Sequence, residues 1–366
     1  MARVHIIGLF HTQSNEQFST CAFTRRCINL GRMLLPHGHE IIEYSNEGTI
    51  AESSEYVPIL DDKEFWELKD LYKREQPNEV ASIDCTLYRK FCEKLIPELS
   101  KRVKKGDIIA HIFGIAYQQL GQLFPEAHHW ECGIGYEQAW SSLRTYETHH
   151  WQSWHHGKEY TDGGAYEWVC PMGHDVDLWT PQYEEGKYLL FFGRITERKG
   201  LPIIKEIAKH TDMKVILCGD GAPELYLDPE IPNLVHMPAL FGKDRDELVG
   251  GAYAMLCPTK YIEPLCNSGI EAQLCGTPLI TTDYGAFSEI MVHNFSGFRC
   301  HTLGDFLEAI RKIPSLNRRA IASRARSMYS LESVGRQMDR IVRQIESLNS
   351  KGWYSTEEFN AVWERM

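Results

Sequence analysis

Two glutamates eight residues apart carry the clearest chemical signal in the sequence. Glu263 and Glu271 lie in the segment YIEPLCNSGIEAQLCGTPL, residues 261–279. We expect a helix that begins between them and ends at Gly276 and Pro278. A helix N-terminus presents unpaired N–H groups and a partial positive charge, so it binds anions. The pair therefore fits a ligand with a central phosphate and hydroxyl-rich groups at both ends, as in a nucleotide-sugar.

Two basic residues follow a predicted strand, Tyr188–Gly193. Arg194 comes directly after this strand, and Lys199 follows five residues later. Ligands of open α/β sheets bind beyond the carboxyl ends of the strands, so both cations would lie at the binding edge. There they can neutralise a diphosphate and stabilise it as a leaving group. For these two residues taken alone, ordinary surface charge is the alternative.

Alternating strands and helices are expected to position these residues. The predicted elements of the first half are Val4–Leu9, Thr24–Leu35, Glu40–Tyr44, 62–104, Asp107–Phe113, Ala116–Leu123 and His128–Cys132. Those of the second half are Tyr188–Gly193, Pro202–His210, Lys214–Gly219, Leu234–Met237, Arg245–Gly250, Ala254–Pro258 and Pro278–Thr282. Such alternation indicates parallel sheets with helices on their faces. We therefore predict an α/β fold with two doubly wound, Rossmann-like domains.

Proline, glycine and acidic residues at 171–186 mark the expected interdomain linker. Residues 1–170 would form an N-terminal, acceptor-side domain, and 187–345 a C-terminal, nucleotide-sugar-binding domain. Apolar residues from Leu331 to Ile345 recur with the period of a helix. Residues 346–366 would form a C-terminal helix that packs back on the N-terminal domain, with a capping box at Ser355–Glu358.

Composition and charge limit the possible classes of protein. The net charge is −11, which argues against a uniformly basic nucleic-acid surface. Eleven cysteines without any C-x-x-C pair indicate free thiols in a reducing compartment, so we expect a cytoplasmic protein. No apolar run approaches the roughly 18 residues of a membrane helix. The start of the chain has the pattern of a buried strand instead of a signal peptide.

The segment 133–168 is rich in tryptophan and histidine, including the pairs His149-His150 and His155-His156. Adjacent residues of a helix diverge by about 100°, so a pair does not readily face one metal ion, and we predict no metal site. The aromatic residues could instead form a wall that stacks on an acceptor sugar or base. Packing within the core is an equal alternative.

Four sequence blocks, in a characteristic order, resemble those of one enzyme family. The blocks are CPMGHDVDLWTP (170–181), FFGRITERKGL (191–201), EPLCNSGIE (263–271) and CGTPLITTDYGAFSEI (275–290). Together they resemble the nucleotide-sugar-binding half of the retaining glycosyltransferases of family 4, within glycosyl transferases group 1. The region from the first block to the last spans about a third of the chain, and the N-terminal half resembles the family only in pattern.

The resemblance implies a GT-B fold, with two Rossmann-like domains facing across a cleft and the nucleoside-diphosphate sugar bound mainly to the C-terminal one. It implies a retaining, hexosyltransferase-like enzyme that needs no metal or other cofactor. Arg194, Lys199 and Glu263 would be catalytic, with the two cations on the diphosphate, and Glu271 would accept hydrogen bonds from the ribose. The donor-binding residues would be Gly8, Gly193, Gly219, Asp220, Leu265, Cys266, Asn267 and Glu271.

Among the departures of the chain from the family pattern, two bear on its substrates. Cys266 stands where the family has glycine, which leaves the identity of the sugar open. The family's usual N-terminal histidine is absent, and its position falls in WECGIGYE, residues 130–137. We therefore consider His11, Glu131 and Tyr136 as acceptor-side groups, with Gly133 and Gly135 in a loop open to substrate. The alternatives are a structural His11 and a Glu131 that only braces the loop.

Three hypotheses of function follow. In the first, a sugar is transferred to a hydroxyl group of a glycan, a lipid or a small molecule. In the second, the acceptor is a nucleic-acid base, flipped out and stacked on residues 133–160, although the acidic net charge counts against it. In the third, the chain is a nucleotide-sugar epimerase or a non-catalytic nucleotide-sugar-binding protein. The sequence names neither the nucleotide, the sugar nor the acceptor.

Overall fold

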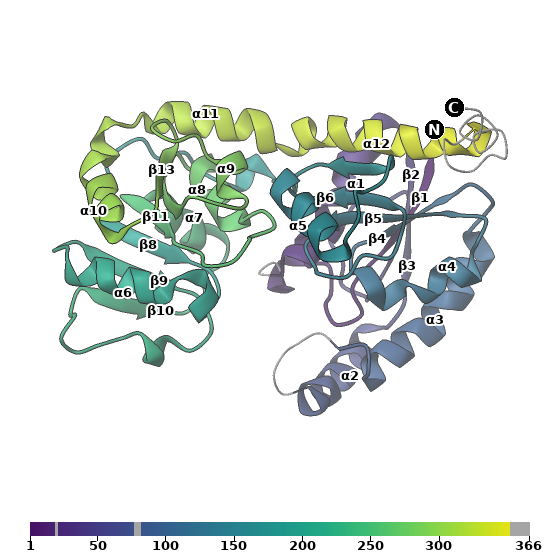
Figure 1. Ribbon diagram of the computed structural model, residues 1–366. Helices are drawn as coiled ribbons and strands as arrows, with labels where there is room; N and C mark the ends of the chain where they lie inside the picture. The colour runs from purple at the N-terminus through teal and green to yellow at the C-terminus, as the bar shows by residue number, and fades with distance from the viewer. Residues whose placement is uncertain (19–20, 77–81, 352–366) are drawn as a thin grey trace. The chain divides into compact units, whose positions relative to one another are not determined.

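The computed structural model describes residues 1–18, 21–76 and 82–351, and the chain forms two compact α/β units (Figure 1). Unit 1 consists of Met1–Glu147, Glu159–Gly173 and Leu331–Met366, of which 352–366 lie outside the described residues. Unit 2 consists of Thr148–Lys158 and His174–Ser330. The predicted capping box at Ser355–Glu358 also lies outside the described residues.

Unit 1 is built on a parallel sheet with the strand order β3-β2-β1-β4-β5-β6-β7. Its strands are β1 (Arg3–Ile7), β2 (Glu40–Ser45), β3 (Glu55–Pro58), β4 (Ile108–His111), β5 (His128–Ile134), β6 (Leu143–Tyr146) and β7 (Glu167–Val169). The order reverses between β1 and β4. Ligands of doubly wound folds bind beyond the carboxyl ends of the strands at such a switch point.

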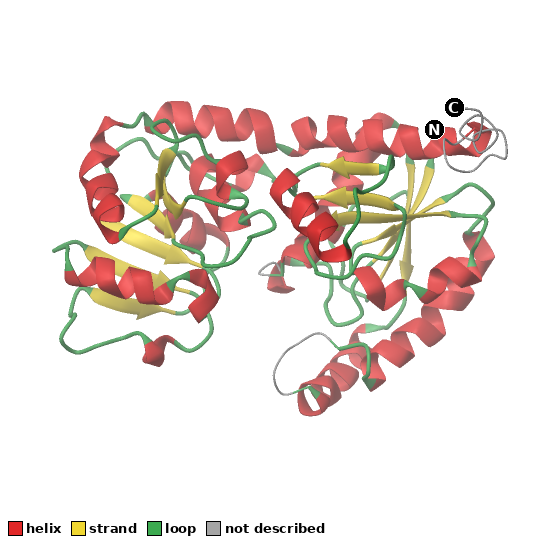
Figure 2. Ribbon diagram, in the orientation of Figure 1, coloured by secondary structure: helices red, strands yellow, loops and turns green. Residues whose placement is uncertain are grey.

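Helices cover both faces of this sheet (Figure 2). They are η1 (Glu16–Phe18), α1 (Ala22–Leu34), η2 (Leu35–His37), α2 (Asp62–Glu75), α3 (Thr86–Arg102), η3 (Gly114–Tyr117), α4 (Gln119–Leu123) and α12 (Leu331–Lys351). α1 and α12 bury one face, and α2, α3 and α4 bury the other. The long apolar strands of the centre are therefore enclosed on both sides, as expected for a parallel sheet.

The long helix α12 belongs to unit 1, although its sequence follows unit 2 directly. Its apolar stripe, which includes Val334, Met338 and Ile345, is buried in the same core as β1 and α1. At Gly335 a Cβ atom would lie 2.9 Å from the backbone oxygen of Met33, so α12 and α1 approach closely. This differs from the predicted boundary, which left 331–345 in the C-terminal domain, because the partner of an apolar stripe is not encoded in the stripe itself.

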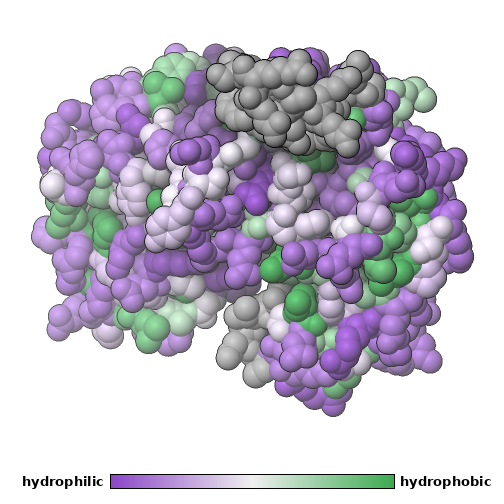
Figure 3. Space-filling view, turned by 45° about the vertical axis from the view of Figure 1, so that its right-hand side comes forward, coloured by the Kyte–Doolittle hydropathy of each residue, from purple (hydrophilic) through white to green (hydrophobic). Residues whose placement is uncertain are grey.

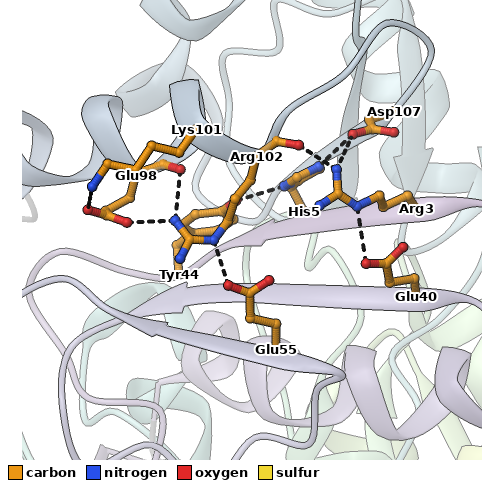
Figure 4. A network of polar contacts seen from close by, with 9 residues as sticks. All are labelled: Arg3, His5, Glu40, Tyr44, Glu55, Glu98, Lys101, Arg102 and Asp107. Carbon is orange, nitrogen blue, oxygen red and sulfur yellow. Dashed lines mark hydrogen bonds and ion pairs between the residues drawn. The ribbon is translucent and has the colours of Figure 1, made fainter.

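A network of polar side chains joins the amino ends of several unit 1 strands (Figure 4). Asp107 accepts hydrogen bonds from Arg3 at 3.1 Å and from His5 at 3.0 Å. Burial lowers the pKa of His5, even though Asp107 favours its charged form. Arg102 of α3 donates to Glu55 of β3 at 2.6 Å. These contacts fasten the edge of the sheet opposite to the carboxyl ends of the strands.

Unit 2 is built on a second parallel sheet, with the order β10-β9-β8-β11-β12-β13. Its strands are β8 (Tyr188–Phe192), β9 (Lys214–Cys218), β10 (Leu234–Met237), β11 (Ala254–Cys257), β12 (Leu279–Thr282) and β13 (Gly297–Cys300). The order reverses between β8 and β11. The loops after β8 and β11 therefore meet at the switch point, where a ligand is expected.

The helices of unit 2 include α8, which carries part of the candidate site. They are α5 (His149–Glu159), η4 (Val176–Leu178), η5 (Glu197–Lys199), α6 (Leu201–Lys209), η6 (Pro223–Leu225), α7 (Gly242–Gly250), α8 (Asn267–Leu274), α9 (Phe287–Ile290), α10 (Leu303–Lys312), η7 (Ile313–Ser315) and α11 (Arg318–Tyr329). α6 and α10 enclose the main apolar core against one face of the sheet. Only the last residue of α5, Glu159, is counted with unit 1.

The predicted fold class, two doubly wound parallel α/β domains, is confirmed. Short strands with weak patterns, β3, β6, β7 and β13, and the helices α5, α9 and α10 were not predicted individually.

All eleven cysteines are free thiols, and ten are buried. The face drawn in Figure 3 is mainly hydrophilic. Among residues 1–18, 21–76 and 82–351, no helix has the length and apolar character needed to span a membrane.

Candidate functional site

The loops that follow β8 and β11 interlock at the switch point of unit 2. The backbone N–H of Lys260 donates to the oxygen of Arg198 at 2.8 Å. The guanidinium of Arg198 lies over the ring of Tyr261, 4.6 Å from its centre. A Cβ atom at Gly200 would lie 1.9 Å from the oxygen of Pro258, so only glycine allows this approach. The two loops are therefore one structural block.

Lys199 and Glu263, predicted on separate grounds, form an ion pair within this block. Glu263 is buried and also accepts a hydrogen bond from Thr259 Oγ1 at 3.0 Å. Burial by itself would lower the pKa of Lys199, but the charge of Glu263 raises it above the ordinary value. The ammonium therefore stays charged, and Nζ also lies 5.4 Å from the centre of the Tyr261 ring.

The helix α8 has the bounds and the ending that the sequence indicated. Gly276 and Thr277 donate to the oxygens of Gln273 and Ala272, as in a Schellman motif, and Gly276 has φ +82°. Cys266 precedes the first turn with φ +67°, a conformation that is uncommon for a residue other than glycine. This is the position at which the related family has glycine.

Glu271 projects from the second turn of α8 and is buried. One of its carboxylate oxygens lies 3.8 Å from a guanidinium nitrogen of Arg245 in α7. Arg245 in turn stacks on Trp179, 4.5 Å from the ring centre. The carboxylate is thus held close to a cation from a neighbouring helix.

Several polar groups around these loops are unsatisfied within the described part of the chain. Thr196 Oγ1 and Asn267 Oδ1 are buried atoms that lack a hydrogen-bond partner there. Arg194 is exposed and makes neither a hydrogen bond nor an ion pair with the described residues. Because buried polar groups in proteins are nearly always paired, these atoms point to water or to a ligand.

The glycines at the ends of β8 and β9 allow these two turns to approach each other. Gly219 has φ +148°, and a Cβ there would lie 2.0 Å from the oxygen of Gly193. The backbone N–H of Ile195 donates to the oxygen of Asp220 at 2.8 Å, and the Asp220 side chain is exposed. Leu265 is buried beneath the loop. Unit 2 thus contains these donor-side residues: Gly193, Arg194, Lys199, Gly219, Asp220, Glu263, Leu265, Cys266, Asn267 and Glu271.

Glu131 and Tyr136, the proposed acceptor-side pair, are bonded to each other in unit 1. The Tyr136 hydroxyl donates to Glu131 at 3.0 Å, and the backbone N–H groups of Trp140 and Ser141 donate to the other carboxylate oxygen at 2.8 Å. Glu131 is fully buried, and burial raises its pKa. This geometry supports the alternative left open above, in which Glu131 braces the loop.

Gly133, expected in a loop open to substrate, lies in strand β5 instead. It has φ +78°, and a Cβ atom there would lie 2.0 Å from the guanidinium carbon of Arg26. Arg26 is buried and forms an ion pair with Glu147. The glycine therefore makes room for a buried cation, which explains why the expectation of an open loop is wrong.

His11 follows β1 at the switch point of unit 1, packed among aromatic rings. Its ring centre lies 5.4 Å from that of Phe113, and rings of Phe23 and Tyr136 continue the cluster. Burial lowers the pKa of His11 to about 3, and the charge of Lys69 acts in the same direction. His11 is therefore neutral at physiological pH, and its Nδ1 lacks a hydrogen-bond partner among the described residues.

Gly8, the donor-side residue proposed in the first half, is enclosed by the sheet of unit 1. Its N–H donates to Tyr44 at 2.8 Å, and its oxygen accepts from Tyr117 at 2.9 Å. A Cβ atom would lie 2.8 Å from the Tyr44 oxygen, so the need for glycine has a packing explanation. Gly8 belongs to unit 1, whereas the other donor-side residues belong to unit 2.

The paired histidines lie on α5, where they have other partners. His150 Nδ1 is 2.8 Å from Glu289, and His155 packs edge-on against Trp151 and Trp154. Trp151 and Trp154 stack on each other at 4.5 Å, with Lys158 over Trp154. In the described ranges, no group of three or more His, Cys, Asp or Glu side chains is arranged to hold a metal ion.

Three residues of the site were not predicted from the sequence. Thr259 lies four residues before Glu263, so its contact with Glu263 could have been suspected from proximity. Thr196, between the two predicted cations, is another short-range signal. Arg245, which approaches Glu271, is 26 residues away in the sequence, and no local pattern indicates the contact.

Comparison with known proteins places the matched region on this same unit. Residues 180–328 match the family model described as glycosyl transferases group 1. One curated relative, the 2-deoxystreptamine N-acetyl-D-glucosaminyltransferase of Niallia circulans, is 32% identical over 118 residues, which are 29% of this chain and 30% of the relative. The chain spans only about a third of the length of the curated relatives it matches.

Solved structures resemble the chain over nearly its whole length. AviGT4, a glycosyltransferase involved in avilamycin A biosynthesis, has a TM-score of 0.67 and 17% identity, with 96% of this chain and 99% of that one covered. HepE of Anabaena, in complex with UDP and glucose, has a TM-score of 0.64 and 12% identity, with 94% and 100% covered. These structures confirm the GT-B type of fold. The match to the glycosyl transferases group 1 model, residues 180–328, lies entirely within unit 2.

Proposed function

We propose that the chain is a glycosyltransferase that moves a sugar from a nucleoside-diphosphate sugar to the hydroxyl group of an acceptor. The observation that carries this proposal is the Lys199–Glu263 ion pair beside the N-terminus of α8, inside the segment that matches the family. It combines a cation, a carboxylate and a helix end at the switch point of one sheet. These three groups could together hold a diphosphate next to a reacting sugar.

The diphosphate would lie against the first turn of α8, within reach of Lys199 and of the exposed Arg194. Backbone N–H groups of the helix and two cations would stabilise the negative charge that grows as the bond to the sugar breaks. The unsatisfied hydroxyl of Thr196 can donate to the diphosphate, and the unsatisfied Oδ1 of Asn267 can accept from a hydroxyl group of the sugar. Since these groups supply the positive charge, the proposed reaction needs no metal ion.

The nucleoside and the sugar would lie on opposite sides of this diphosphate. Glu271, held by Arg245, would accept hydrogen bonds from the ribose, and Gly219 with Asp220 would line the nucleotide pocket. Glu263 would lie beside the sugar and its departing phosphate. The left-handed Cys266 would shape the sugar pocket at the position where the related family has glycine.

Membership in the retaining family 4 is part of the proposal, and it rests on the four sequence blocks. In such a reaction the anomeric carbon becomes oxocarbenium-like, and the acceptor hydroxyl attacks from the face that the diphosphate leaves. His11, Glu131 and Tyr136 remain the proposed acceptor-side residues, although Glu131 is committed to bracing its loop. A glycan, a lipid or a small hydroxylated molecule is the proposed class of acceptor.

A screen of nucleoside-diphosphate sugars tests the proposal. The protein is mixed with a set of UDP-, GDP-, ADP- and dTDP-sugars, and thermal shift and release of nucleoside diphosphate are measured. We expect one donor to stabilise the protein and to be hydrolysed slowly in the absence of acceptor. Conversion of a donor to an isomer would instead support the epimerase hypothesis. Lack of any stabilisation across the set would contradict donor binding altogether.

A further inference from the structure

The helix α5 is attached to unit 2 through its first turn, which touches the candidate donor loop. Thr148 lies directly before α5, and its hydroxyl accepts a hydrogen bond from the N–H of Trp151 at 3.1 Å. The same hydroxyl donates to the backbone oxygen of Pro264 at 3.0 Å. Thr148 is buried. One side chain thus caps a helix and fixes the residue that follows Glu263.

Glu289 makes the second attachment at the same turn. Its carboxylate accepts from the backbone N–H of His149 at 3.0 Å and from that of His150 at 2.9 Å. His150 Nδ1 lies 2.8 Å from it as well. Carboxylates are favoured at a helix N-terminus, because they satisfy free N–H groups and complement the helix dipole. These bonds to Glu289 lower its pKa, although burial works in the opposite direction.

The segment that carries Glu289 also packs on the donor loop. Gly285 has φ +62°, and a Cβ atom there would lie 3.4 Å from the backbone nitrogen of Glu263. Ser288 Oγ donates to the oxygen of Gly285 at 2.9 Å and also lies 3.2 Å from His150 Nδ1. Two distant segments, around residues 148–150 and 285–289, therefore pack against each other and against the dipeptide Glu263-Pro264.

We propose that Thr148 and Glu289 are positioning residues of the donor site, acting through Pro264 and the first turn of α5. This inference rests on the proposed function, because it assigns the two residues to the diphosphate site described above. Neither residue touches the ligand in this arrangement. Thr148 holds the loop that joins Glu263 to α8, and Glu289 holds the helix turn from which Thr148 projects.

The physical reason is the sensitivity of the site to the path of this loop. The Pro264 oxygen lies one residue after Glu263 and three residues before the start of α8. A shift of the loop would move the carboxylate and the helix N-terminus relative to Lys199. Misplacement by about 1 Å can reduce catalysis by about a hundredfold, so a single distant hydrogen bond can affect the reaction.

The experiment compares two threonines that cap helices in the same unit. Thr148→Val removes the cap of α5 together with the bond to Pro264, and Thr148→Ser keeps the hydroxyl. Thr302→Val is the matched control, because Thr302 caps α10 through the N–H of Asp305 at 3.2 Å. Affinity for UDP and for GDP is measured by calorimetry, and the melting temperature of each variant is recorded.

We expect Thr148→Val to bind the preferred nucleoside diphosphate about tenfold more weakly than the wild type, the loss typical of one hydrogen bond. Thr148→Ser should restore the affinity. Thr302→Val should lower the melting temperature but leave the affinity for the nucleoside diphosphate unchanged. Unchanged binding by Thr148→Val would overturn the inference, as would equal weakening by both valine variants. If Thr148→Val does not fold, Glu289→Gln is measured in its place. The amide oxygen still accepts one hydrogen bond at the helix end, but the NH2 group cannot accept the second, so weaker nucleotide binding is again expected.

The failure of this inference can be told apart from the failure of the proposed function. If the wild type binds neither UDP nor GDP, nor any donor of the screen above, the donor site itself is refuted, and the positioning role falls with it. If the wild type binds and the Thr148 variants do not differ from it, only the positioning role is refuted.

Discussion

At the scale of single residues, the pairing of Lys199 with Glu263 matters most for the proposed function. The ammonium is held by a buried carboxylate, so a diphosphate would have to share it with Glu263. The pairing with Glu263 keeps the ammonium in place before the ligand arrives, and this reduces the reorganisation needed during the reaction. Arg194, by contrast, is exposed and available to a ligand.

Replacing Lys199 by alanine should therefore reduce turnover strongly. We expect kcat to fall by about 10²- to 10³-fold, as for loss of one preorganised charge in other active sites. The measurement is the initial rate with the donor found in the screen. Lys205→Ala is the control, because Lys205 lies six residues away and pairs at 2.9 Å with Asp228 on the surface. Turnover of Lys199→Ala near that of the control would refute the leaving-group role.

A second residue-scale prediction concerns Glu43 of β2, which is buried beneath the loop after β1. Burial raises its pKa to about 7, from an ordinary value of 4.5. The folded protein therefore keeps the carboxyl protonated where the unfolded chain has already lost the proton. This contribution to stability is complete below about pH 4.5 and disappears as the pH rises through 7.

We expect the free energy of unfolding of the wild type to fall by up to about 3 kcal/mol between pH 5 and pH 8 through this group. Glu43→Gln, which stays neutral, should lose that part of the pH dependence. Urea unfolding at the two pH values measures it. Glu16→Gln, at an exposed position, should behave as the wild type does. The same slope in Glu43→Gln and the wild type would show that Glu43 is ionised in the folded state.

At the scale of elements, α12 completes the core of unit 1, although it follows the whole of unit 2 in the sequence. Its buried stripe forms part of the core of unit 1, next to α1 and the sheet. His39 and Asp339 add a polar contact of 2.8 Å between the first and the last parts of unit 1. Unit 1 is therefore closed only after the whole of unit 2 has been made by the ribosome.

Truncating the α12 stripe should destabilise unit 1 specifically. Met338 is fully buried in this core, and Met338→Ala should lower the free energy of unfolding by about 2–4 kcal/mol. Arg336→Ala, in the same helix but exposed, should change it by less than about 0.5 kcal/mol. Urea denaturation measures both. A negligible effect of Met338→Ala would show that the α12 stripe is not packed as described.

At the scale of the whole molecule, each unit has its own sheet and its own core. The candidate donor residues of unit 2 follow β8, β9 or β11, or lie on α8. A bound nucleoside diphosphate should therefore protect backbone groups mainly in unit 2.

Hydrogen exchange can locate this effect along the chain. With saturating UDP or GDP, we expect the largest gain of protection at residues 193–199 and 265–269, because these backbone groups would face the diphosphate. The strands β2 and β3 of unit 1 serve as the internal reference, and they should change little. Protection confined to unit 1 would place the nucleotide elsewhere and would contradict the site proposed here.

Short-range patterns were sufficient for much of unit 2. The limits of α8, the stop at Gly276 and the approach of Lys199 to Glu263 follow from helix signals and from strands whose carboxyl ends meet at one edge. In these cases the physical cause is local, or it is a general property of parallel sheets. Nearly every strand of the second sheet could therefore be placed from its apolar run alone.

What the amino-acid sequence determined by itself was the fold class, the order of the main elements and the approach of Lys199 to Glu263. Only the tertiary structure decided that α12 closes unit 1, that α5 is fastened to unit 2 and that Glu131 braces a loop. Helical periodicity says which side of a helix is buried, but not against what. A carboxylate likewise finds its partners only when distant segments come together, because hydrogen bonds depend on position in space and not on separation along the chain.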